Sequence, residues 1–170
     1  MTFGNCPGTC VAGARARNAS LHDTLHHFMS TREQRLFPAR LAMLPETASF
    51  AQAFCDRHGI VRHDALRLTL IIEELFTNTV EHGYRGECDA EIRIALSVER
   101  GGVGVLYEDS APRYDPLARL SDAPASIARA VESRPIGGLG VYLVGQLVEH
   151  ASYVYEEGCN RLWLTMLFVT

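Results

Sequence analysis

Alternation of hydrophobic and polar residues predicts five strands along this chain. The clearest is the segment 91–100, which carries an apolar residue at every second position and is followed by two turn glycines. Residues 103–109 continue the same apolar face as a return strand, so the two segments form a predicted hairpin. Three further strands are predicted by the same criterion: residues 34–39, 152–156 and 161–168.

Three other segments have helical periodicity: residues 45–59, 64–82 and 139–150. With the strands, they give the order strand, helix, helix, strand, strand, helix, strand, strand. Two successive hairpins cannot be wound as a parallel sheet, so the predicted fold class is α+β. We expect a two-layer sandwich in which a mixed or antiparallel sheet is covered on one face by three helices. Residues 1–31 lack an apolar period and are predicted to be a flexible tail before one domain at 32–170.

Glu74 and Asn78 interrupt an otherwise apolar helical segment. Their spacing places a carboxylate and an amide on one face of the helix. An Asn oxygen is a hard ligand that suits Mg²⁺, and a Glu one turn away can accept a proton from a nucleophile. The alternative is that both are polar residues on a solvent-exposed face of the helix.

Asp109 and a glycine-rich segment follow in the chain. Asp109 ends a predicted strand, where it either terminates the strand or accepts a hydrogen bond from an adenine amino group. Residues 137–140, with the sequence GGLG, open the third predicted helix and fit a phosphate cradle of backbone N–H groups. The alternative is that these glycines permit close helix packing. A dinucleotide-binding fingerprint is excluded because no hydrophobic strand precedes the glycines.

The chain contains no lysine, since all 16 of its basic residues are arginine. A P-loop, a eukaryotic-type protein kinase site and Schiff-base catalysis each need a lysine, so this chain cannot supply any of them. A nucleotide site would instead use arginine, backbone N–H groups, a helix N-terminus and Mg²⁺.

Charge and cysteine usage limit the partners and the compartment. The net charge of −4 argues against nonspecific nucleic-acid binding, and no apolar run is long enough to span a membrane. The absence of a signal sequence and the five scattered cysteines favour the cytoplasm. A C-x3-C-x11-H-x3-H spacing near the N-terminus is close to a zinc-finger pattern, but we interpret it as coincidence.

Together, these motifs resemble the GHKL ATPase superfamily, and more narrowly the bacterial anti-sigma-factor serine/threonine kinases of partner-switching systems. The resemblance covers about residues 34–170 and rests on four ordered blocks: EELFTNTVEHGY (73–84), EDSAPRYDPL (108–117), GGLGVYLV (137–144) and NRLWLTM (160–166). It implies the Bergerat-type ATP-binding fold and a kinase that uses ATP and Mg²⁺. It also implies two partners, a small STAS-type anti-anti-sigma protein that is phosphorylated on Ser or Thr, and a sigma factor that is sequestered.

The resemblance also implies roles for individual residues. Glu74 matches the general base, Asn78 the Mg²⁺ ligand, and Asp109 the residue that binds adenine. The other nucleotide contacts that it implies are His82, Ala111, Gly137, Gly138, Leu139, Gly140 and Thr165, of which Thr165 would support the adenine through water.

Ala111 departs from the family pattern, which usually has glycine two residues after the Asp. Its Cβ lies where the backbone approaches the base, and alanine resists positive φ. This departure motivates an alternative function, a catalytically inactive module that regulates a partner by binding alone. A third possibility, the ATP domain of a histidine kinase, lacks a segment that could carry the phosphoacceptor His. A homodimer is expected by family analogy only.

Overall fold

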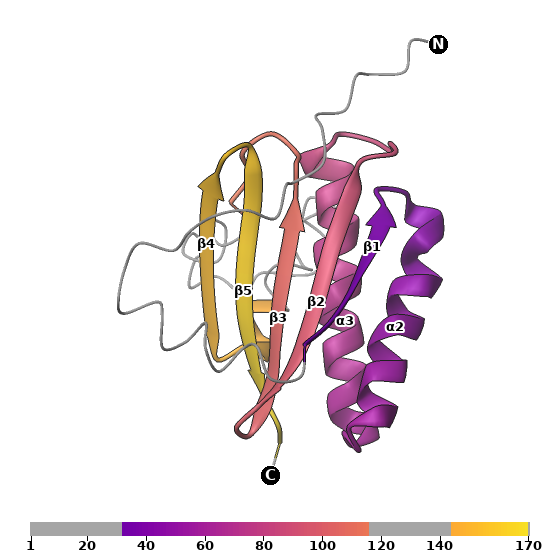
Figure 1. Ribbon diagram of the computed structural model, residues 1–170, viewed down its shortest axis with the longest axis vertical. Coiled ribbons are helices and arrows are strands. Elements are labelled where there is room, and N and C mark those ends of the chain that lie inside the picture. The colour runs from indigo at the N-terminus through magenta and orange to yellow at the C-terminus, as the bar shows by residue number, and fades with distance from the viewer. Residues whose placement is uncertain (1–31, 116–143, 170) are drawn as a thin grey trace, which may run out of the picture.

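The computed structural model describes residues 32–115 and 144–169, and the structural statements below concern these residues. They form one five-stranded sheet in the order β1-β2-β3-β5-β4, in which all neighbouring strands are antiparallel (Figure 1). The strands are β1 (Arg32–Pro38), β2 (Glu91–Glu99), β3 (Gly102–Asp109), β4 (His150–Glu156) and β5 (Cys159–Leu167). This sheet confirms the predicted α+β class.

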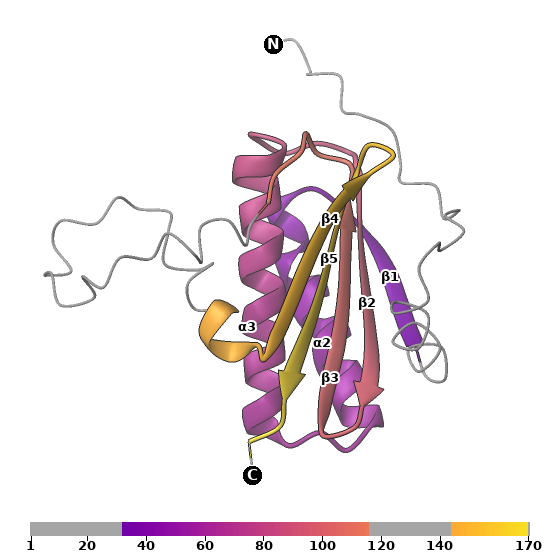
Figure 2. The ribbon, with the colours of Figure 1, turned by 90° about the vertical axis from the view of Figure 1, so that its left-hand side faces the viewer.

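The helices lie on one face of the sheet (Figure 2). A 3₁₀ turn, η1 (Leu41–Met43), leads into α2 (Leu44–Arg57), and α3 (Arg62–Asn78) follows. A further helical turn at residues 144–147 lies on the same side as α3, and its Val144 belongs to the buried core. Together they form the predicted helical layer.

The core fills the space between this layer and the sheet. Apolar residues at alternate positions of the central strands, such as Ile94, Val105 and Leu164, are almost completely buried there. They pack with residues of α2 and α3, including Phe54 and Phe76, both of which are fully inaccessible. Truncation of such an aromatic residue to alanine typically costs about 3–5 kcal/mol. The sheet and α3 therefore form a rigid frame for the polar residues at their edge.

Arg67 holds the C-terminal part of the chain against α3. Its guanidinium donates hydrogen bonds to the carbonyl oxygens of Leu147 (3.1 Å) and Leu167 (2.8 Å) and to Asp64 Oδ1 (2.8 Å). Asp64, in the first turn of α3, is 1% exposed, so this ion pair is shielded from solvent. The contacts fix the 144–147 turn and the end of β5 relative to the helix.

The opposite face of the sheet carries an ion cluster. Glu108 of β3 accepts hydrogen bonds from Arg161 of β5 at 2.9 Å and from Arg93 of β2 at 3.2 Å. All three side chains are mostly buried, so each charge depends on its partners for compensation. The cluster joins the three central strands directly behind the end of β3 that holds Asp109.

Two predicted helix ends differ in detail from the structure. The helix predicted to run to His82 does reach this residue, but it is α-helical only to Asn78 and continues as a π-helical segment, η2 (Thr79–Gly83). In η2 the Tyr84 N–H donates to Thr79 O, five residues earlier, at 2.8 Å. The last predicted helix extends to His150, but this residue instead begins β4 opposite Thr165, because pairing with β5 satisfies its backbone. The expected tail at 1–31 lies outside the described residues.

Candidate nucleotide site

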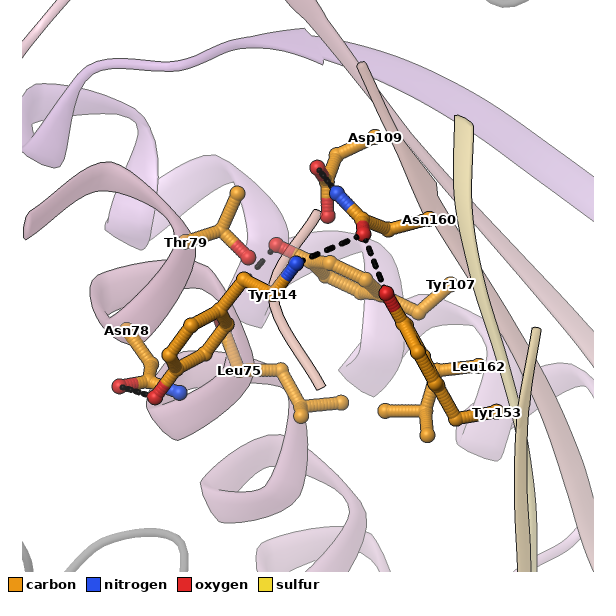
Figure 3. Close-up of a pocket in the computed structure, with 9 residues that line it drawn as sticks. All are labelled: Leu75, Asn78, Thr79, Tyr107, Asp109, Tyr114, Tyr153, Asn160 and Leu162. Carbon is orange, nitrogen blue, oxygen red and sulfur yellow. Dashed lines mark hydrogen bonds between the residues drawn. The ribbon is translucent and has the colours of Figure 1, made fainter. Parts of the chain in front are cut away.

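A pocket lies where the C-terminal end of α3 faces the ends of β3, β4 and β5 (Figure 3). It is small and partly open to solvent. Its lining combines apolar side chains with a few convergent polar groups, which is typical of a small-molecule site. The lining residues are Leu75, Asn78, Thr79, Tyr107, Asp109, Tyr114, Tyr153, Asn160 and Leu162.

Asp109 and Asn160 face each other across the paired strands β3 and β5. Asn160 Nδ2 donates a 2.8 Å hydrogen bond to Asp109 Oδ1, and the Ala111 N–H donates to the same oxygen at 2.9 Å. Asp109 is 6% exposed. The pocket therefore contains a buried carboxylate whose direction is set by two donors.

Burial and hydrogen bonding act on the pKa of Asp109 in opposite directions. Burial has the larger effect and raises the pKa above its usual value, because the charged form loses water. The hydrogen bonds from Asn160 and from the Ala111 N–H lower the pKa, because they stabilise the carboxylate. The net shift is upward, as is common for carboxyl groups at functional sites.

Asn78 brings an amide into the same pocket from the last turn of α3. It is 8% exposed, and its Oδ1 accepts a long hydrogen bond of 3.4 Å from the hydroxyl of Tyr114. Asn78 and Asp109 were predicted from separate parts of the sequence, and both side chains line this pocket (Figure 3).

Glu74 lies one helical turn before Asn78 on α3 and is half-buried. It does not belong to the set of residues that line the pocket. Burial raises the pKa of Glu74, and the negative charge of Glu73 raises it further. A carboxyl with a raised pKa is better matched to proton transfer near neutral pH than an ordinary one.

The other predicted contacts are placed differently. Ala111 is buried beside Asp109. In the described ranges the non-glycine residues with positive φ are Arg85 and Glu157, so the φ of Ala111 is not positive. The alanine therefore needs no left-handed backbone here. His82 is half-exposed in η2 and is absent from the lining of the pocket. Residues 137–140, predicted to cradle phosphate, lie outside the described residues.

Thr165 is not in the pocket, and its predicted place beside the base is a correction. Side chains alternate between the two faces of a strand, and Asn160, Leu162 and Leu164 share the helix-facing side of β5. Thr165 is an odd number of residues from each of them and so points to the opposite face. Its hydroxyl donates to Glu99 there, at 3.3 Å.

Comparison with known proteins identifies the domain. Residues 37–166 match the family described as histidine kinase-like ATPase domain, which is more than half of the chain. The chain belongs to this family. As a member of the family, it is similar to the serine-protein kinase RsbW of Listeria monocytogenes serotype 4a, with 24% identity over 143 residues that cover 84% of this chain and 86% of the relative.

A second relative is the RsbW serine-protein kinase of Bacillus cereus, which is 28% identical over 108 residues, covering 63% of this chain and 67% of the relative. Among solved structures, the SiaB-SiaC complex from Pseudomonas aeruginosa superposes on this ATPase domain with a TM-score of 0.51. The match has 12% identity, covers 92% of this chain and 100% of the other, and supports the fold alone. The resemblance found in the sequence motifs is therefore confirmed at the level of the family.

A histidine kinase-like ATPase domain implies a nucleotide, and the pocket residues fit one. Asp109 offers an acceptor for an amino group, and Asn78 offers an oxygen suited to Mg²⁺. Within the described ranges, no cluster of three or more His, Cys, Asp or Glu side chains could hold a metal alone. Mg²⁺ commonly uses one or two protein ligands together with phosphates and water, so a single Asn oxygen is compatible with it. Among the same residues, no helix is long and apolar enough to cross a membrane.

Of the nine residues that line the pocket, the sequence motifs predicted Asn78 and Asp109, and the seven that they missed include Asn160, Tyr114 and Tyr153. The alternation of the last strand could have revealed Asn160. It is the polar residue on the face of that strand that also carries Leu162, Leu164 and Met166. No comparable pattern marks Tyr114 or Tyr153, because Tyr114 follows a strand in an irregular segment and β4 is largely exposed.

Proposed function

We propose that this chain is an Mg²⁺- and ATP-dependent serine/threonine protein kinase of the anti-sigma-factor type. It would phosphorylate a small STAS-type anti-anti-sigma protein and would otherwise sequester a sigma factor, in the cytoplasm. One observation supports the proposal most strongly: Asn78 and Asp109, predicted from separate motifs, line a single pocket. Two relatives named serine-protein kinase, each matched over about two thirds or more of its length, support the activity.

The base of ATP would bind at the Asp109 end of the pocket. A buried, ionised carboxylate can accept a hydrogen bond but cannot donate one, so it favours an amino group. Leu75 and Leu162 line the same space and provide apolar surface for the flat ring. The triphosphate would extend from there toward Asn78 and the glycines at 137–140.

Phosphoryl transfer would use two residues of α3. Asn78 Oδ1 would hold Mg²⁺, which offsets the negative charge of the phosphates. Glu74 would take the proton from the substrate hydroxyl while that oxygen bonds to the γ-phosphorus and the bond to the β,γ-bridging oxygen breaks, releasing ADP. His82, Ala111 and the segment 137–140 would complete the nucleotide contacts. Possible homodimerisation belongs to the same proposal and follows family analogy.

The alternative is a module that regulates its partner by binding alone. Ala111, in place of the usual glycine, motivates it. Such a protein would hold a sigma factor or another partner without transferring phosphate. It predicts the same fold but no phosphorylated product.

A phosphotransfer assay distinguishes the two functions. The purified chain would be incubated with Mg²⁺, radiolabelled ATP and a panel of purified STAS-domain proteins from the same genome. At a pH well above the acidic limb of the reaction, we expect transfer to Ser or Thr of one panel member, a loss of about 10²–10⁴-fold in Glu74→Gln, and little change in the adjacent control Glu73→Gln. Full activity of Glu74→Gln would refute the role of Glu74, and binding without transfer by the wild type would favour the alternative.

A further inference from the structure

The side-chain amide of Asn160 makes four hydrogen bonds inside the pocket. Its Nδ2 donates to Asp109 Oδ1 at 2.8 Å and to the Ala111 carbonyl oxygen at 3.0 Å. Its Oδ1 accepts from the Tyr153 hydroxyl at 2.7 Å and from the Tyr114 backbone N–H at 3.1 Å (Figure 3). Both amide hydrogens and both lone pairs of the oxygen are thus engaged, and the residue is only 5% exposed.

This pattern permits one orientation of the amide. Turning it by 180° would place Nδ2 against the donors of Tyr153 and Tyr114, and Oδ1 against the acceptors of Asp109 and Ala111. All four contacts would then be lost or repulsive. Asn160 therefore presents a fixed N–H donor to Asp109 from β5, and its own orientation is set by residues on three other segments.

The hydrogen bond from Asn160 favours the charged, accepting form of Asp109, because it stabilises the carboxylate. The carboxyl is 6% exposed, and this burial raises its pKa, whereas the Asn160 hydrogen bond lowers it. Tyr84, Tyr107 and Tyr153 feel the charge of Asp109, since the pKa values of their hydroxyls are raised by burial and by the negative charge of Asp109. Arg113 and Asp115 also act on Tyr153, in opposite directions. Within this set, the Asn160 amide supplies a neutral donor directly to the carboxyl.

We propose that Asn160 is a specificity-determining, positioning residue that makes this site select a purine with a 6-amino group over one with a 6-oxo group. The inference rests on the proposed function, because it assumes that the base binds at Asp109. A charged carboxylate accepts a hydrogen bond from a 6-amino group and repels a 6-oxo oxygen. A carboxyl that has lost the Asn160 donor protonates more readily, and in that form it can donate to a 6-oxo group.

The test compares ATP with inosine triphosphate, which carries a 6-oxo group, by calorimetric titration with Mg²⁺. The proteins are the wild type, Asn160→Leu, Asn160→Thr and Thr165→Val. Asn160→Leu removes every hydrogen bond of the amide at similar size, and Asn160→Thr keeps one hydroxyl donor if the leucine variant does not fold. Thr165→Val is the matched control, because it changes the same strand on the opposite face of the sheet.

We expect the wild type and Thr165→Val to prefer ATP by roughly 10- to 100-fold, the discrimination typical of a hydrogen bond to a charged group. In Asn160→Leu this ratio should fall at least about tenfold, with Asn160→Thr between the two. The pH at which ATP affinity declines on acidification should also move upward in Asn160→Leu.

Equal losses of ATP and inosine triphosphate in the Asn160 variants would show a purely structural role and would overturn this inference while leaving the proposed function intact. If the wild type bound neither nucleotide, the proposed function would fail, and the inference would fail with it. If Thr165→Val changed the ratio as much as Asn160→Leu, selectivity would not depend on the contact with Asp109.

Discussion

The carboxylate of Asp109 receives a 2.8 Å hydrogen bond from the side-chain amide of Asn160, its cross-strand partner on β5. The pair joins two strands at their ends, where the sheet meets the last turn of α3. It thus places a buried acceptor at the inner end of a pocket whose other end carries Asn78. The nucleotide site proposed above is built from this geometry, and it leads to the following predictions.

Replacement of Asp109 by Asn should weaken ATP binding without lowering the stability of the fold. The substitution puts an amide where the carboxylate accepts from the base, so ATP affinity should fall roughly 10- to 100-fold. Because the folded-state pKa of Asp109 is raised, the native state binds its proton more tightly, and its contribution to stability is lost as pH rises through that pKa. At neutral pH, Asp109→Asn should therefore unfold at an equal or higher urea concentration than the wild type. Lower stability together with unchanged ATP affinity would contradict both arguments.

The acidic limb of the pH–rate profile should reflect the protonation of Glu74. A general base acts in its deprotonated form, and burial together with Glu73 raises the pKa of Glu74. Phosphotransfer at saturating Mg²⁺-ATP should therefore begin to fall at a pH above the usual range of a glutamate. Glu73→Gln removes one of the two causes and should move this limb to lower pH. A limb that does not move would exclude charge coupling between these neighbours.

Tyr114 should compete with Mg²⁺ for Asn78. Its hydroxyl donates a long 3.4 Å hydrogen bond to Asn78 Oδ1, the atom proposed as the metal ligand. Removing this weak bond in Tyr114→Phe should raise Mg²⁺-ATP affinity about twofold, at the low end of hydrogen-bond energies. Binding measured with a chelator in place of Mg²⁺ is the control, and it should not change. A gain of the same size without metal would mean that the hydroxyl affects the nucleotide directly.

The ion cluster behind the site should be important for stability. Glu108→Gln would leave Arg93 and Arg161 without their shared carboxylate in a largely buried setting, and should cost about 3 kcal/mol in the free energy of unfolding. Glu156→Gln is the matched control. Its side chain is 59% exposed and lies 3.4 Å from Arg161, so it should cost less than about 0.5 kcal/mol. Urea titration of both variants measures the difference, and equal effects would refute the proposed importance of the cluster.

The sequence was sufficient to predict most of the fold because the buried strands alternate so regularly. Ile92, Ile94 and Leu96 define the inner face of β2, and the glycines after it place the turn. The start of β4 was less predictable. Its residues are largely exposed and show no clear alternation of apolar and polar positions. The strand conformation of His150 therefore follows from its pairing with Thr165 of β5, not from the local sequence.

Only those residues of the site that can be recognised within a single segment were predictable from the sequence. Asn78 and Asp109 are polar residues at the ends of strongly apolar elements, and each could be recognised within its own segment. The pairing of Asp109 with Asn160 depends on strand register between distant segments. Motif matching alone selected Thr165, whereas the alternation of β5 places Asn160 on the pocket side.

The central claim is that Mg²⁺-ATP binds between Asn78 and Asp109, and calorimetric titration of Mg²⁺-ATP into the wild type and Asn78→Ala tests it most directly. The account predicts micromolar-range binding by the wild type and at least about a tenfold loss in Asn78→Ala, with both proteins folded. Undiminished binding by Asn78→Ala would contradict the proposed metal ligand. Absence of binding by the wild type would contradict the account as a whole and would favour a module that acts by binding a partner alone.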